Sequence, residues 1–173
     1  MASSFQADEY VWLSFLRGVP GLLTIGCAVQ GWRLAAGVCL VVAVWSDVAV
    51  GVVAGRKSLP KTQSVLQVEG FMDFLCFVWA PVQMALAIQL DGWVLAGAGL
   101  FVPAGIFRLA RFNVEGLLGG GYKGLPVTYN GYIFPAIAVV LNYVSVHRGI
   151  ALLVVFLGVA ILMTSDRFVT PEM

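Results

Sequence analysis

The stretch VLQVEGFMDFLCFVWAPVQMALAI (Val65–Ile88) is long and apolar enough to cross a lipid bilayer, yet it contains two carboxylates, Glu69 and Asp73. A spanning helix needs about 20 predominantly apolar residues. An ionised carboxylate near the bilayer midplane costs about 2.5–3.5 kcal/mol on insertion scales. Because the two residues are four positions apart, a helix places them on one face. Their presence indicates a cavity, a partner or a metal that uses them.

The whole chain has this apolar character. Of its 173 residues, 60% are hydrophobic and 11% are charged, with a mean hydropathy of +0.93, whereas soluble domains average about 25% charged residues. We therefore predict an all-α polytopic membrane protein, a six-transmembrane-helix bundle that forms a single domain over residues 1–173. The predicted helices are Val11–Val29, Leu34–Ala54, Val65–Ile88, Trp93–Leu109, Tyr129–Val146 and Ile150–Met163. The net charge of +1 provides no basic field for a nucleic-acid partner.

Basic residues are distributed unequally between the two ends of the predicted helices. One end carries Arg56, Lys57, Lys61, Arg108, Arg111, Lys123 and Arg167, and the other carries Arg33 and Arg148. Loops rich in Lys and Arg stay in the cytoplasm. The asymmetry predicts an integral membrane protein with both termini on the cytoplasmic, basic-rich side. It also places the carboxylates near that side.

A third carboxylate, Asp47, lies in the predicted second helix and shares a stripe with Gly51 and Ala54. Small residues on such a stripe let a neighbouring helix or a flat ligand approach the backbone. Three carboxylates from two adjacent helices suit a divalent metal that bridges to phosphate oxygens. Alternatively, Glu69 and Asp73 pair with arginines and hold helices together. Ion passage is a third interpretation, because intramembrane carboxylates also mark ion paths.

Several arginines could either bind a phosphate or carboxylate ligand or make structural contacts. Arg108 and Arg111 are three residues apart within RLARFN, so they could hold a phosphate or a carboxylate, or could anchor the helix end at lipid headgroups. Arg56 is a further candidate partner at the membrane surface. Arg17 lies within the first apolar run, where it could extend to the interface or pair with a carboxylate inside the bundle.

Two segments, DVAVGVVAGR (Asp47–Arg56) and VLQVEGFMD (Val65–Asp73), together resemble the signature of the CDP-alcohol phosphotransferase family. That signature reads D-x-x-D-G-x-x-A-R, then G-x-x-x-D-x-x-x-D. The flank CFVWAP (Cys76–Pro81) is similar to the corresponding segment of bacterial phosphatidylserine synthases, as are RLARFN (Arg108–Asn113) and GLP (Gly124–Pro126). The resemblance thus covers a motif region at 47–81 and a second region at 108–126.

Some signature positions depart from the family pattern. Val50 stands at the second Asp, Gly55 stands at the Arg with Arg56 one step late, Val65 stands at the second Gly, and Glu69 stands at the third Asp. Asp47 and Asp73 keep the first and last Asp. The departures remove one metal ligand and place a larger side chain where the family keeps a glycine beside the nucleotide.

The resemblance implies a phospholipid-synthesis enzyme that transfers a phosphatidyl group from a CDP-linked lipid to a small alcohol such as serine and releases CMP. It implies a divalent metal, Mg or Mn, weakly bound or absent here, held by Asp47, Glu69 and Asp73, with Asp73 also the catalytic base. Nucleotide and phosphate contacts would come from Gly51, Ala54, Arg56, Arg108 and Arg111. The departures favour an alternative, an inactive pseudoenzyme that is a lipid-binding or structural subunit of a larger membrane complex. The family also implies a homodimer.

Overall fold

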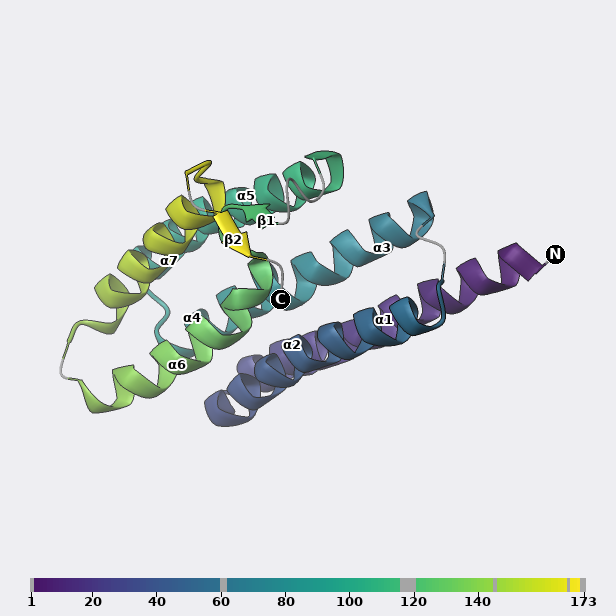
Figure 1. Cartoon of the computed structure of the whole chain (residues 1–173). Coiled ribbons are helices and arrows are strands. Elements are labelled where there is room, and N and C mark those ends of the chain that lie inside the picture. The colour runs from purple at the N-terminus through teal and green to yellow at the C-terminus, as the bar shows by residue number, and fades with distance from the viewer. Residues whose placement is uncertain (1, 60–61, 116–120, 145, 168, 172–173) are drawn as a thin grey trace.

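The computed structural model describes residues 2–59, 62–115, 121–144, 146–167 and 169–171. Long helices that alternate in direction make up nearly all of this part of the chain (Figure 1). The helices are α1 (Ala2–Val29), α2 (Arg33–Arg56), α3 (Gln63–Phe74), α4 (Ala80–Ile88), α5 (Gly92–Glu115), α6 (Asn130–Tyr143) and α7 (Arg148–Thr164). A π-helical turn, η1 (Leu75–Trp79), joins α3 to α4, and a 3₁₀ turn, η2 (Val127–Tyr129), precedes α6.

Within the described residues, four helical segments are long and apolar enough to cross a membrane: Glu9–Val29, Arg33–Arg56, Gln63–Ile88 and Gly92–Val114. They overlap the first four predicted spans, so the helices are confirmed, and their length and composition are compatible with an integral membrane protein. The last two predicted helices are present as α6 and α7, which are shorter than these four segments. At 1.5 Å per residue, the 17 residues of α7 extend about 26 Å and the 14 residues of α6 about 21 Å, against a hydrocarbon core of about 30 Å. Six membrane crossings are therefore not shown.

The main core lies where η1, α5, α6 and α7 meet. Phe101, Phe134 and Phe156, one from each of the last three helices, form a triangle with ring centroids 5.1–5.5 Å apart. Tilted aromatic contacts of this kind add to the energy of burial. On the other side of the bundle, α1 packs along α2, and both contact the α3–α4 segment. The carboxylates of α2 and α3 consequently face α1.

The π-turn η1 begins two residues after Asp73 and is fixed by a buried amide. Asn130 Nδ2 donates a hydrogen bond to the Phe77 carbonyl oxygen at 2.7 Å, and Asn130 is fully buried. A π-turn inserts an extra residue into a helix and is frequent near functional sites. Here α1 also approaches closely, because a Cβ added to Gly21 would lie 2.9 Å from Cys76 Cα. Cys76 is a free, buried cysteine.

A short strand pair is the exception to the all-α prediction. β1 (Gly121–Lys123) pairs antiparallel with β2 (Val169–Pro171). The GLP segment that follows β1 is fixed on the end of α7. Gly124 has φ +77°, a Cβ there would lie 2.4 Å from the Met163 carbonyl oxygen, and Leu125 N donates to Leu162 O at 3.0 Å. Gly124 is therefore required by backbone geometry, whatever its family role.

Candidate functional site

The candidate site is a cluster of three carboxylates around the guanidinium of Arg17. Asp47 comes from α2, Glu69 and Asp73 come from α3, and Arg17 comes from α1. Arg17 Nη1 lies 2.5 Å from Asp47 Oδ1 and 3.8 Å from Glu69 Oε1, and Arg17 Nη2 lies 2.8 Å from Asp73 Oδ1. Arg17 Nη2 also donates to the Glu69 carbonyl oxygen at 3.1 Å. We refer to these four side chains as the Arg17 cluster.

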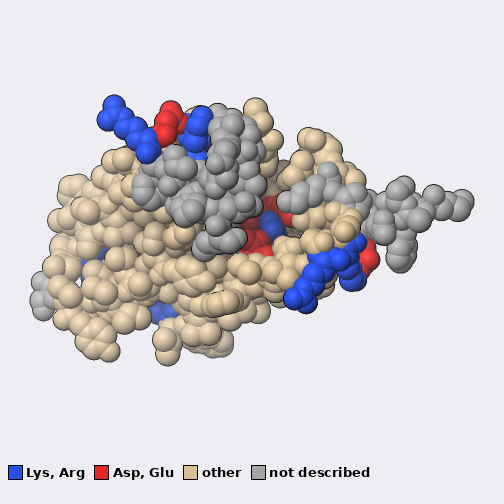
Figure 2. Space-filling view, in the orientation of Figure 1, with Lys and Arg blue, Asp and Glu red and all other residues tan. Residues whose placement is uncertain are grey.

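The Arg17 cluster is mostly withdrawn from the surface. Arg17 is 8% exposed, and the three carboxylates are 17–21% exposed. Figure 2 shows acidic and basic side chains in contact within a hollow on the surface of the bundle. A planar guanidinium can bridge carboxylates that approach from different directions. Arg17 of α1 bridges carboxylates of α2 and α3 in this way. Arg108, 4% exposed, adds a second positive charge near Asp73.

Sequence reasoning missed Tyr10, whose hydroxyl donates to Glu69 Oε1 at 2.9 Å. Tyr10 is 2% exposed, and the buried Ser14 hydroxyl donates to the Tyr10 carbonyl oxygen. Tyr10, Ser14 and Arg17 are four and three residues apart, so they share one face of α1. A polar stripe along an otherwise apolar helix was the signal that could have identified this face as the partner of the carboxylates.

Of the residues predicted to contact a nucleotide, Arg108 lies near Asp73, whereas the three on α2, Gly51, Ala54 and Arg56, have other surroundings. Arg56 is exposed, and Gly51 is exposed with open space around its Cβ direction. Ala54 is buried in a small core together with Tyr10 and Val65. Val65, which replaces the family glycine, is fully buried there. The space beside Ala54 is therefore filled by side chains of this chain.

The two arginines of RLARFN separate from each other. Arg111 Nη1 pairs with Asp166 Oδ1 at 2.7 Å, after α7, and its guanidinium lies 4.8 Å from the Phe107 ring centroid. Arg108 turns inward, with its guanidinium 5.6 Å from the Phe112 ring centroid. The predicted paired phosphate holder is thus divided, and Arg111 links α5 to the C-terminal segment.

The cluster does not fit the divalent metal that the family resemblance implies. Asp47 Oδ1 and Asp73 Oδ1 both contact Arg17, and Glu69 Oε1 accepts the Tyr10 hydroxyl. The guanidinium lies between the carboxylates that a shared cation would need, and Val50 offers no oxygen. In the part of the chain that the structure describes, no group of three or more His, Cys, Asp or Glu side chains has the arrangement of a metal site. Positive charge is supplied by Arg17.

The contacts with Arg17 also show which basic side chain pairs with Glu69 and Asp73 in the structure. The predicted alternative, an ion pair that holds helices together, is the observed geometry, although its main arginine is Arg17 rather than Arg56 or Arg111. The prediction that Arg17 pairs with a carboxylate inside the bundle is confirmed.

Neither a scan against models of protein families nor a search of curated proteins gave a match to this chain.

Proposed function

We propose that the chain is a six-helix membrane protein similar to CDP-alcohol phosphotransferases in which an arginine has replaced the metal, and that it acts as a lipid-binding or structural subunit of a membrane complex. The observation that carries this proposal is the placement of Arg17 against all three carboxylates. In phosphoryl transfer, metal ions neutralise charge on the transferred group. Carboxylates whose charge is neutralised by an arginine of the same chain no longer hold such a metal ion.

The filled space beside Ala54 gives separate support. A nucleotide needs room against the small residues of α2, but Val65 and Tyr10 pack there, and Val50 is half-buried against the same small core. Of the signature departures, Val50 and Val65 therefore act together, one removing a ligand and both occupying volume. These features are expected of a protein that keeps the fold but whose former active-site space is filled by packed side chains.

The proposal includes a topology of six membrane passes. Helices α6 and α7 complete six passes when the bilayer thins locally or their flanking residues reach the interface. The basic-rich end, with both chain termini, faces the cytoplasm by the distribution of Lys and Arg. Asp47, Glu69 and Asp73 lie toward that end.

The test is CMP release by the full chain in lipid nanodiscs, with CDP-diacylglycerol, serine or another small alcohol, and Mg²⁺ or Mn²⁺. The wild type and Asp73→Asn should both stay at the no-protein background, and Mn²⁺ should not raise the unfolding temperature of the wild type. Arg17→Met, which frees the carboxylates, should acquire Mn²⁺ stabilisation that Val50→Asp on the same background increases. The protein should also purify with a larger membrane complex or with bound phospholipid.

The enzyme is the second candidate, favoured by the partial exposure of the carboxylates in the hollow, 21% for Asp73. In that case Asp73 takes the proton of the attacking hydroxyl, and Arg17 must leave the carboxylates first. Wild-type CMP release above background, lost by about 10²–10⁴-fold in Asp73→Asn, would establish this activity and refute the inactive subunit.

A further inference from the structure

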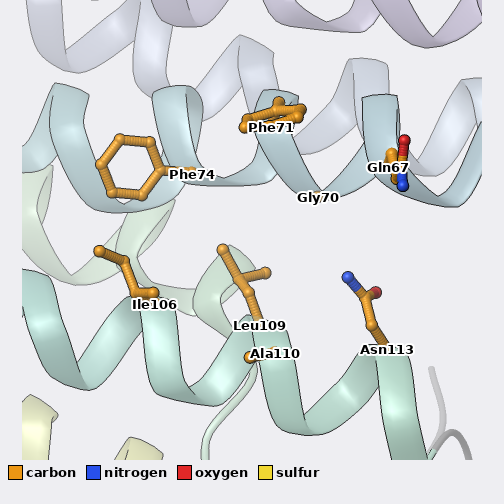
Figure 3. Close-up of a pocket in the computed structure, with 8 residues that line it drawn as sticks. All are labelled: Gln67, Gly70, Phe71, Phe74, Ile106, Leu109, Ala110 and Asn113. Carbon is orange, nitrogen blue, oxygen red and sulfur yellow. The ribbon is translucent and has the colours of Figure 1, made fainter.

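A groove of about 380 Å³ runs between α3 and α5 (Figure 3). At one end, the amides of Gln67 and Asn113 lie across from each other. Toward the other end, the lining is apolar and includes Phe74 and Ile106. The groove therefore has a polar end and an apolar end.

The polar end lies at the depth of lipid ester groups. The spans Gln63–Ile88 and Gly92–Val114 contain 26 and 23 residues, or about 39 and 34 Å at 1.5 Å per residue. Both exceed the hydrocarbon core of about 30 Å, so their ends extend into the interfacial region. Gln67 is near the start of α3 and Asn113 near the end of α5. Primary amides at this depth can donate to ester carbonyls instead of remaining in hydrocarbon.

The length of the groove selects its occupant. From Gln67 to Phe74 the helix rises about 10 Å, which is about two-thirds of one leaflet's share of the hydrocarbon core. A spanning helix from a partner would cross both leaflets and would leave the amides facing apolar side chains. An acyl chain begins at the ester and runs inward, which matches the polar-to-apolar order of the groove.

We propose that the groove binds one acyl chain of a phospholipid from the leaflet at the start of α3, with the chain's ester group at Gln67 and Asn113. Gly70 and Ala110 leave the space open, and Phe71, which is 68% exposed, lines the groove beside Gly70. This inference gives the lipid-binding role proposed above a location. It does not depend on the loss of phosphotransfer, because a protein with or without activity can hold a lipid there.

The experiment uses the full chain in nanodiscs that contain a phosphatidylcholine with a diazirine in its acyl chain. After irradiation, mass spectrometry maps the crosslinked residues. We expect crosslinks on α3 and α5 to concentrate on groove residues, at several times the yield of the equally lipid-exposed positions around Gly99 of α5.

Gly70→Leu is the test variant, because a Cβ there meets only Asn113 Nδ2, at 3.4 Å, so the added side chain enters the groove without touching backbone. The matched control is Gly99→Leu, where a Cβ meets nothing within 4 Å. Gly70→Leu should reduce groove crosslinks to the yield of the Gly99 region, and Gly99→Leu should leave them unchanged. Equal yields at both regions in the wild type would overturn the proposal.

The amides are tested separately with Gln67→Leu combined with Asn113→Leu. Hydrogen bonds within membranes are worth about 0.6 kcal/mol on average and at most about 1.7, so groove labelling should fall about 3-fold to 18-fold relative to the Gly99 region. Undiminished labelling would refute the role of the amides. Crosslinks from the groove to a second copy of the chain, in place of lipid, would refute the acyl-chain occupant. CMP release is not part of either readout, so failure here leaves the proposed function unaffected.

Discussion

Replacing Arg17 with methionine should destabilise the protein more than the loss of any exposed ion pair. Methionine keeps much of the length and apolar contact of the arginine stem but leaves the three carboxylates of the Arg17 cluster without their shared counter-ion. Removing one partner of a buried ion pair costs about 3–5 kcal/mol. Because each carboxylate of the cluster is about a fifth exposed and can recruit water, we expect the lower end, about 3 kcal/mol.

The measurement is the thermal unfolding of the purified chain in one detergent. For chains of 150–250 residues, 1 kcal/mol shifts the unfolding temperature by about 2–4 °C, so Arg17→Met should lower it by about 6–12 °C. The matched control is Lys57→Met. Lys57 pairs with Glu9, but its side chain is 53% exposed, and exposed pairs contribute about 0–1 kcal/mol. The control should therefore shift the unfolding temperature by at most about 4 °C.

A second-site rescue separates charge from packing. Adding Asp47→Asn and Asp73→Asn to Arg17→Met removes two of the three uncompensated charges, and neutral replacements of a whole buried ion pair are often close to neutral in stability. The triple variant should recover most of the lost unfolding temperature. If it is no more stable than Arg17→Met alone, or if Arg17→Met and Lys57→Met shift the temperature equally, the electrostatic account of the cluster is wrong.

Two further predictions concern the packing that positions α3 and use the same unfolding assay. Gly21→Ala should destabilise by about 1–3 kcal/mol, because its Cβ would lie 2.9 Å from Cys76 Cα, whereas Gly26→Ala in the same helix meets nothing within 4 Å and should stabilise by about 0.5–1 kcal/mol. Equal effects would contradict the close approach of α1 to η1. Asn130→Leu should cost about 1–3 kcal/mol by leaving the buried Phe77 carbonyl oxygen without its donor, and an unchanged unfolding temperature would show that the amide does not fix the π-turn.

The helical membrane architecture could be predicted from sequence because hydropathy and run length act locally. The first four spans depend on their own composition, and the structure has them at nearly the predicted residues. The ends of the last two helices depend on more distant contacts. η2 intervenes before α6, and at Val144 the backbone becomes extended, with φ −109° and ψ 130°. The β1–β2 pair joins residues about 50 positions apart, and no periodicity within either short segment indicates the other.

The carboxylates of the cluster could be identified from sequence, and Arg17 was a candidate partner, but that one arginine meets all three carboxylates could not be predicted. An acidic residue in an apolar segment is conspicuous on composition alone, and helical spacing places Glu69 and Asp73 together. Which of several arginines meets them depends on how α1 is rotated and on its depth beside α3. That rotation is set by tertiary packing, including the contact of Gly21 with Cys76. Only the polar stripe of Tyr10 and Arg17 carries a local trace of it.

The Arg17 cluster and the groove are related because both depend on the rotation of α3 about its axis. At 3.6 residues per turn, Glu69 and Asp73 lie on one side of the helix, and Gln67, Gly70 and Phe74 centre on a second face about 110° around the helix from it. Arg17 on α1, which also pairs with Asp47 on α2, pairs with Glu69 and Asp73 and so fixes the rotation of α3 about its axis, because a turned helix would expose unpaired carboxylates to hydrocarbon. The same rotation determines which residues face α5. In the function proposed above, an arginine that replaced a metal would keep the structural half of the metal's role, the orientation of α3, and would not supply the chemical half.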